Sequence, residues 1–182
     1  MDTTWREVGE QVSRWQTSLG AEGLSPGDRV AVQVEKSPQA LFLYLGCLRA
    51  GFTYLPLNTA YLAKEVDYFM ENAEPAAVVC RPMDKQRITE QATAHGIGRV
   101  YTLDADGSGS LTVQAAGVPA EFGITECSDD DVAVILYTSG TTGRPKGAMI
   151  SHANLAANGL ALHQAWGWQP GDVLLHVLPI FH

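Results

Sequence analysis

Apolar residues follow helical and strand spacings in turn along most of the chain. Trp5, Val8, Val12, Trp15 and Leu19 recur every three or four residues, which places them on one face of an amphipathic helix. After this helix, short runs rich in β-branched residues predict strands, and longer periodic segments predict helices. The predicted strands span residues 29–34, 54–57, 76–80, 100–103 and 132–137, and the further helices span residues 38–50, 63–72 and 84–94.

Polar and conformationally special residues mark the ends of these helices. Thr4, with Glu7 three residues later, forms a capping box at the start of the first helix. Ser37 and Pro38 open the second helix, because the serine accepts a bond from a free N–H and the proline presets φ. Gly51 closes it. The sequence therefore indicates separate helices with defined ends between the strands.

Strands that alternate with helices of about 10–15 residues are typical of βαβ units. We therefore expect an α/β fold, with a mostly parallel sheet that carries helices on both faces. Residues 104–131 interrupt the pattern because they are rich in Gly, Ser and Asp. We predict an irregular connection there, with a short strand at residues 111–113. The length of 182 residues suits one domain or a large subdomain.

The composition limits the partners that this chain can bind. It is 46% apolar and 18% charged, as in an ordinary globular protein, and its net charge is -8. The sequence has no basic patch, so we exclude a nucleic-acid-binding surface. An acidic chain repels anions at long range, so an anionic ligand would have to be held by local backbone N–H groups and a few cations.

The cysteines and the apolar runs indicate the compartment. Cys47, Cys80 and Cys127 lie far apart without a CxxC pair, and Cys47 and Cys80 sit in apolar runs, so we predict buried free thiols. No apolar stretch reaches the roughly 18 residues that span a bilayer, and the N-terminus is polar rather than signal-like. We expect a cytoplasmic protein without a membrane span.

The segment Thr138–Gly147 follows the last predicted strand and carries the candidate chemistry. Its glycines let backbone N–H groups point inward, its hydroxyls add donors, and Arg144 and Lys146 add positive charge. These features predict a phosphate-binding loop. A plain hairpin loop is the alternative, since Gly, Ser and Thr are common in turns. The coincidence of strand context, glycine spacing and lysine favours the phosphate loop.

Two other nucleotide-binding motifs are excluded. In the Walker type, Gly-Lys-Ser/Thr follows the first glycine and four spacers, and this chain has Pro145 where the second glycine should be. Gly96 and Gly98 lack the third glycine of a dinucleotide fingerprint. The loop at residues 138–147 is therefore a phosphate cradle of a different kind.

Four of the histidines and a pair of tryptophans are assigned structural or solvent roles. No His, Cys or carboxylate spacing resembles a metal site. The pair Trp166 and Trp168 is interpreted as core packing rather than as a ligand platform. The histidines concerned are His152 at a helix start, His95 and His163 in helical surroundings, and His176 in a strand.

The segment YTSGTTGRPKGAMISHANL resembles the signature loop of the adenylate-forming superfamily, which includes acyl-CoA synthetases, luciferases and peptide-synthetase adenylation domains. The resemblance covers nearly the whole chain through landmarks such as GDRVAV and AGFTYLPLN. The segments EKSPQALFLYLGCLRAGFTYLPLNTAY, DYFMENAEPAAVVC and LLHVLPIFH are similar to malonyl-CoA synthetases. The resemblance implies that the fold is an incomplete large N-terminal domain of an adenylate-forming enzyme.

The resemblance also implies a reaction and assigns residues to it. In this family the loop holds the β- and γ-phosphates of ATP, which is used with Mg²⁺, while a carboxylate attacks the α-phosphate. An acyl-AMP and pyrophosphate form, and the thiol of CoA then displaces AMP. His182 matches a histidine that lies near the acyl pocket, and it is the catalytic candidate. The phosphate-binding candidates are Thr138, Ser139, Gly140, Thr141, Thr142, Gly143 and Lys146.

Measured against the family, the chain lacks the segments that carry the magnesium-binding glutamate, the ribose-binding aspartate and the catalytic lysine of the small C-terminal domain. We expect residues 1–182 to be the N-terminal portion of the AMP-binding domain, truncated at both ends and catalytically silent alone. The complete enzyme would make an acyl-CoA from ATP, CoA and malonate or another short acid. The arginine that selects a dicarboxylate lies outside this chain. A non-catalytic nucleotide-binding module, and an adenylation domain for a fatty, aryl or amino acid, are the alternatives.

Overall fold

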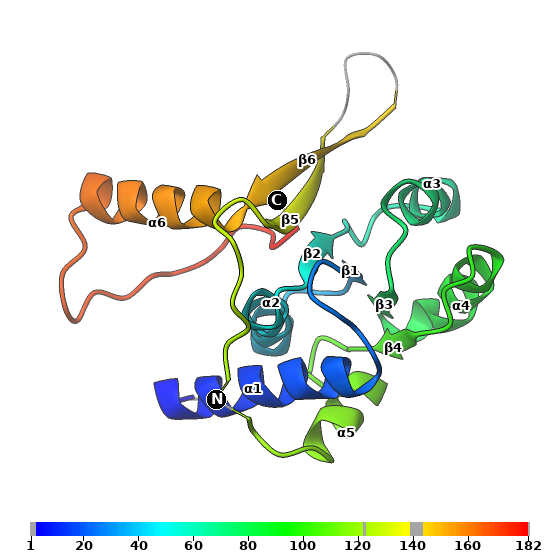
Figure 1. Cartoon of the computed structure of the whole chain (residues 1–182), viewed down its shortest axis with the longest axis horizontal. Helices are drawn as coiled ribbons and strands as arrows, with labels where there is room; N and C mark the ends of the chain where they lie inside the picture. The colour runs from blue at the N-terminus through cyan, green and yellow to red at the C-terminus, as the bar shows by residue number, and fades with distance from the viewer. Residues whose placement is uncertain (1–2, 122, 139–143, 182) are drawn as a thin grey trace.

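A single mixed sheet forms the centre of the molecule (Figure 1). The computed structural model describes residues 3–121, 123–138 and 144–181. In this part of the chain six strands lie in the order β4-β3-β1-β2-β5-β6. Their bounds are β1 (Arg29–Gln33), β2 (Thr53–Pro56), β3 (Ala77–Cys80), β4 (Val100–Thr102), β5 (Val132–Thr138) and β6 (Lys146–Ser151).

The sheet is parallel except at one edge. The central strand β1 pairs in parallel with both neighbours, so that Val30 lies beside Tyr54 of β2 and beside Ala77 of β3. β3 pairs in parallel with β4, and β2 pairs in parallel with β5. Among the described strands only β6 runs antiparallel, as the second strand of a hairpin with β5. The prediction of a mostly parallel sheet is confirmed, and β6 is a strand that the sequence pattern did not indicate.

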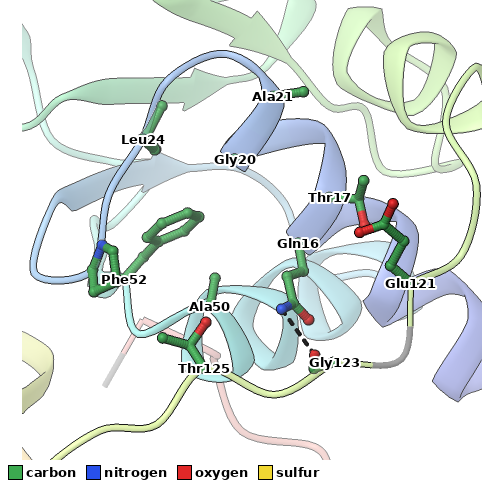
Figure 2. A pocket seen from close by; sticks show the side chains of 11 residues that line it. Gln16, Thr17, Gly20, Ala21, Leu24, Ala50, Phe52, Glu121, Gly123 and Thr125 are labelled. Atoms are coloured by element: carbon green, nitrogen blue, oxygen red, sulfur yellow. Dashed lines mark hydrogen bonds between the residues drawn. The ribbon is translucent and has the colours of Figure 1, made fainter.

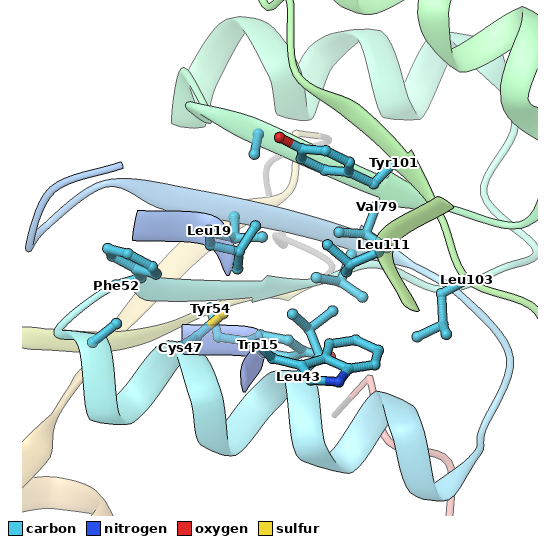
Figure 3. Packing of buried hydrophobic residues seen from close by; sticks show 14 of the residues in the cluster. Trp15, Leu19, Leu43, Cys47, Phe52, Tyr54, Val79, Tyr101, Leu103 and Leu111 are labelled. Atoms are coloured by element: carbon cyan, nitrogen blue, oxygen red, sulfur yellow. The ribbon is translucent and has the colours of Figure 1, made fainter. Parts of the chain in front are cut away.

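Helices cover both faces of the sheet, as predicted. The first core cluster joins β1 residues such as Val30 and Val32 to helices α1, α2 and α5 (Figure 3). The second cluster lies on the opposite face, where Ala31 of β1 packs with residues of α3 and α4. Alternate side chains of one strand therefore serve different cores. The helices are α1 (Trp5–Ala21), α2 (Pro38–Ala50), α3 (Ala63–Ala73), α4 (Lys85–Ala94), α5 (Ser110–Ala116) and α6 (His152–Trp166), with a 3₁₀ turn at Pro82–Asp84.

The predicted helix ends are confirmed by their hydrogen bonds. Thr4 and Glu7 form a reciprocal capping box, in which the Thr4 N–H donates to a Glu7 carboxylate oxygen at 2.6 Å. The Ser37 hydroxyl accepts a bond from the Ala40 N–H at 3.1 Å, with Pro38 in the first turn. Gly51 ends α2 in the left-handed region at φ 72°. The buried free thiols of Cys47 and Cys80 are also confirmed, whereas the thiol of Cys127 is free but only half-buried.

The predicted strand at residues 111–113 is wrong, because these residues belong to helix α5. Leu111 and Ala115 lie four residues apart and are both buried against α1 and the sheet, which is the helical spacing. Val113 lies between them and is 75% exposed. The β-branched pair Thr112 and Val113 suggested a strand, but a short helix buries Leu111 and Ala115 on one side.

Two further predictions are wrong near the end of the chain. His176 lies in an extended segment without strand pairing among the described residues. Trp166 is 61% exposed, and its ring stands 6.0 Å from that of Trp168 at a tilt of 54°, so the pair packs on itself rather than in a core. Helix α6 touches the first core cluster through Leu155, which is partly buried. Among the described helices, none has the length and apolar character needed to cross a membrane.

Candidate functional site

The hairpin of β5 and β6 presents the predicted phosphate loop beyond the carboxyl end of β5 (Figure 1). Thr138 ends β5 and Lys146 begins β6, and these two residues are register partners across the hairpin. They therefore bracket the loop from opposite strands. Ser139, Gly140, Thr141, Thr142 and Gly143 lie outside the described residues. The strands β5 and β6 that flank this segment pair as an antiparallel hairpin, and phosphate binding by the segment stays a prediction.

Positive charge at the mouth of the loop is free to meet an anion. The side chains of Arg144 and Lys146 are exposed. Within the described residues, neither cation has a carboxylate partner within ion-pair distance. Two exposed cations next to each other raise the local positive charge in a chain whose net charge is -8.

Helix α3 lies beside the hairpin and bonds to it on both sides of the loop. The Tyr68 hydroxyl donates to the carbonyl oxygen of Pro145 at 2.9 Å. The Tyr137 hydroxyl donates to the Asn72 side-chain oxygen at 2.6 Å. Pro145 directly precedes Lys146, and Tyr137 directly precedes Thr138. Each contact therefore falls next to one of the residues that bracket the loop.

Aromatic packing surrounds these two bonds. The Tyr137 ring lies 4.4 Å from that of Phe69, which is buried in the second core cluster, and 6.2 Å from that of Tyr68. Burial, together with the neighbouring Tyr68, raises the pKa of Tyr137 to about 12. The Tyr137 hydroxyl therefore stays protonated at neutral pH and acts as a donor.

The segment of residues 176–180 also lies near the carboxyl ends of the parallel strands. Lys36 follows the carboxyl end of β1, and its ammonium group donates to the carbonyl oxygens of His176 and Leu178, the latter at 3.0 Å. Ile180 packs against the first core cluster. This places the backbone just before His182 at the carboxyl edge, where β5 delivers the loop. His182 itself lies outside the described residues.

The remaining histidines do not gather around the loop. His95 follows α4 and contacts Asp67 of α3 at 2.9 Å, and His152 is the first residue of α6. His163 lies in the exposed α6. Across residues 3–121, 123–138 and 144–181, no group of three or more His, Cys, Asp or Glu side chains is arranged to hold a metal ion.

A cavity of about 380 Å³ lies at the amino ends of strands β1 and β2 (Figure 2). Leu24 and Pro26, which precede β1, and Phe52, which precedes β2, line it together with Gln16 of α1. The Gln16 side-chain amide donates to the Gly123 carbonyl at 3.0 Å across the opening. Since these residues precede the strands, the cavity is separate from the loop that follows β5.

Sequence reasoning identified the loop but missed the side chains that support it. Tyr68, Phe69 and Asn72 belong to a segment interpreted only as a helix. Their spacing of three and four residues puts Phe69 and Asn72, and Tyr68 and Asn72, on one side of that helix. The partners Pro145 and Tyr137 are 77 and 65 residues away in sequence, so no local pattern linked them.

Known proteins are similar to this chain over nearly its whole length. The AMP-binding enzyme family matches residues 1–182. A crotonobetaine/carnitine–CoA ligase of Escherichia coli O1:K1 / APEC is 30% identical over 98% of this chain, which corresponds to 36% of that protein. The chain therefore spans about a third of the length of the curated relatives that it matches.

Solved structures agree in fold. ATP-bound MatB from Rhodopseudomonas palustris is 52% identical, with a TM-score of 0.94 over 98% of this chain and 35% of that one. The long-chain-fatty-acid–CoA ligase FadD1 from Archaeoglobus fulgidus is 28% identical, with a TM-score of 0.90 over 99% of this chain and 36% of that one. The expected fold, an incomplete N-terminal domain of an adenylate-forming enzyme, is confirmed.

Proposed function

The chain belongs to the AMP-binding enzyme family, and from this membership we propose that residues 1–182 are the N-terminal part of an AMP-forming acyl-CoA ligase. The position of the loop carries the proposal. Thr138 and Lys146 face each other at its mouth, next to the exposed Arg144, with no carboxylate neutralising either cation among the described residues. The 52% identity with ATP-bound MatB supports ATP as the ligand.

The proposed reaction has two steps. The loop restrains the β- and γ-phosphates of ATP while a carboxylate oxygen of the acid attacks the α-phosphorus. An acyl-AMP forms and pyrophosphate leaves. The thiolate of CoA then attacks the acyl carbonyl carbon, a thioester forms, and AMP leaves. Lys146 and the loop N–H groups stabilise the departing pyrophosphate, since charge-assisted hydrogen bonds are about twice as strong as neutral ones.

Malonate is the acid that we propose first. The motifs shared with malonyl-CoA synthetases and the 52% identity with MatB support it. The relatives named for crotonobetaine or carnitine and for long-chain fatty acids share only 30% and 28% of their aligned residues with this chain. Those acids are the alternatives.

We propose that the complete ligase contains a remainder of the large domain and a small C-terminal domain beside these residues. The chain corresponds to 36% of the carnitine ligase and 35% of MatB, which leaves room for both. The acid-binding residues, a magnesium-binding glutamate and a catalytic lysine would then come from that remainder. His182 would contribute near the acyl group.

The test uses an enzyme of full relative length that carries this sequence. It is incubated with ATP, Mg²⁺ and CoA plus malonate, crotonobetaine, carnitine, a long-chain fatty acid or an aryl acid, and AMP, pyrophosphate and thioester are measured. We expect thioester with malonate and a loss of AMP formation in Lys146→Ala. Turnover with a fatty acid but not malonate would overturn the substrate, and no AMP with any acid would overturn the reaction.

The 182-residue chain alone tests whether catalysis needs the remainder of the ligase. We expect it to release no AMP or pyrophosphate above the Lys146→Ala variant, because the loop has no opposing groups to activate. Turnover above that control would contradict this requirement. Tight nucleotide binding without turnover, together with an inactive full-length enzyme, would favour a non-catalytic binding module.

A further inference from the structure

Two hydroxyl groups connect the phosphate-loop hairpin to helix α3. One belongs to the helix and reaches the hairpin, from Tyr68 to the Pro145 carbonyl, and the other belongs to the hairpin and reaches the helix, from Tyr137 to Asn72. Pro145, which accepts the first bond, directly precedes Lys146. Tyr137, which donates the second bond, directly precedes Thr138. The loop residues thus lie between two anchor points on the same helix.

In the part of the chain that the structure describes, the outer half of the hairpin lies at the edge of the sheet. Strands β2 and β5 pair in parallel at Tyr54 and Val134, well before the loop. The strand β6 is the edge of the sheet among the described strands, and its residues from Lys146 to Met149 are exposed. Among the described residues, the side-chain hydrogen bonds that flank the loop from another element include those with α3.

The helix side of this connection is packed into the core. Phe69 is 1% exposed and sits in the second core cluster with Val66 and Met70 of the same helix. The Tyr68 ring stands at 61° to that of Phe69, and the rings of Tyr68 and Tyr137 stand at 70° to each other. The Tyr137 ring is tilted by 41° to that of Phe69. Edge-to-face packing of this kind limits how the rings can turn. The hydroxyl groups are therefore held at fixed points relative to the sheet.

We infer that Tyr68 and Asn72 are positioning residues that fix the two ends of the phosphate loop for ATP. Each acts through a neighbour of the loop, Tyr68 through Pro145 and Asn72 through Tyr137. This inference rests on the proposed function of the loop. Preorganised donors stabilise developing charge without rearranging during the reaction. Fixing the two ends of the loop should therefore strengthen its binding of the β- and γ-phosphates.

The hydroxyl groups distinguish this role from simple core packing. Tyr61 packs its ring 5.1 Å from Phe69, yet its hydroxyl has no hydrogen bond to any residue in the described part of the chain. Tyr61→Phe is therefore a matched control for Tyr68→Phe. Both variants remove one oxygen from the same aromatic cluster, and of the two only Tyr68→Phe removes the hydrogen bond to Pro145.

The first experiment measures backbone amide exchange in the 182-residue chain and needs no activity. Loss of one hydrogen bond predicts about fivefold faster exchange at Lys146, Gly147 and Ala148 in Tyr68→Phe. Asn72→Ala should speed exchange at Tyr137 and Thr138 by a similar factor. Unchanged exchange in both variants, or an equal effect from Tyr61→Phe, would overturn the inference.

The second experiment measures kinetics in the full-length enzyme. We expect the KM for ATP to rise several-fold in Tyr68→Phe and Asn72→Ala, while the KM values for the acid and CoA and the melting temperature stay close to wild type. Asn72→Asp, which keeps an acceptor for Tyr137, should restore most of the ATP affinity. Equal changes in all three KM values would indicate a general structural role and contradict positioning.

The two experiments separate the inference from the function beneath it. If the wild-type enzyme forms no adenylate from any acid, the proposed function fails, and the role in ATP binding fails with it. The exchange result still decides whether α3 holds the loop ends. If exchange changes but the KM for ATP does not, the connection exists and the positioning role is wrong.

Discussion

Gly147 of β6 lies directly against Ile135 of β5, so a Cβ atom at Gly147 would come within 3.0 Å of Ile135 Cγ2. The same Cβ would meet the Tyr137 ring at 3.4 Å. Ile135 is β-branched and stiff, so it yields little. Glycine therefore lets the two strands of the loop hairpin pack closely while Tyr137 reaches Asn72.

We predict that Gly147→Ala destabilises the fold. Overpacking costs about 1–3 kcal/mol, partly offset by the lower entropy of the unfolded chain, so the expected net loss is about 1 kcal/mol. For a domain of this size that corresponds to a melting temperature lower by about 2–4 °C. Thermal unfolding followed by circular dichroism measures the change.

Gly159 provides the matched control because it sits in the middle of α6 with open space around its Cβ position. Gly159→Ala makes the same change in the unfolded chain without a clash. We expect its melting temperature to stay the same or to rise. Equal effects of the two variants would show that the approach to Ile135 does not matter.

Removal of the Lys146 charge should impair the full-length enzyme at the ATP step. Losing one donor to a developing oxyanion typically costs about 10²–10³ in kcat. We predict a loss of this order for Lys146→Ala, with a smaller loss for Lys146→Arg because the charge remains. Steady-state kinetics with varied ATP measures it.

Lys85→Ala is the control for Lys146→Ala. Lys85 is the first residue of α4, on the far side of the sheet order from the hairpin, and it is exposed. It loses the same charge without changing the loop. Wild-type kinetics in Lys146→Ala, or a similar loss in Lys85→Ala, would contradict the role given to the loop lysine.

The sequence predicted the α/β architecture well because its information there is local. The spacing of Trp15 and Leu19, the cap at Ser37 and the glycine at Gly51 each specify structure within a few neighbouring residues, and each prediction is confirmed. The segment at 111–113 failed for the opposite reason. Its short apolar run fits either element, and burial of Leu111 against distant helices decided for a helix.

The candidate site was predictable only in its loop. The glycine and hydroxyl pattern of residues 138–147 predicts phosphate binding from composition and order alone, and it stays a prediction. The contacts of Tyr68 with Pro145 and of Tyr137 with Asn72 join residues 77 and 65 positions apart. Such pairs depend on the order of strands in the sheet, which puts α3 beside β5, and a pattern read along the chain does not contain that order.

Leu43 and Leu41 give a test of the first core on a single helix. Leu43 is fully buried in the cluster beneath α1, whereas Leu41 is 50% exposed. We predict that Leu43→Ala lowers the free energy of unfolding by about 2–5 kcal/mol, because it leaves a cavity. Leu41→Ala should change it by at most about 0.5 kcal/mol. Urea unfolding of both variants decides, and similar losses would contradict the assignment of faces on α2.

The ionisation of Tyr137 tests the contact between the hairpin and α3 by pH. Burial raises its pKa from 10.0 to about 12, so the native state holds this proton more tightly than the unfolded chain does. The resulting stabilisation is complete below pH 10 and is lost as the pH rises through about 12. Subtracting the ultraviolet titration of Tyr137→Phe from that of the wild type isolates this hydroxyl. We expect the difference to have its midpoint near pH 12, and a midpoint near 10 would show that Tyr137 is open to water rather than packed between Phe69 and Asn72.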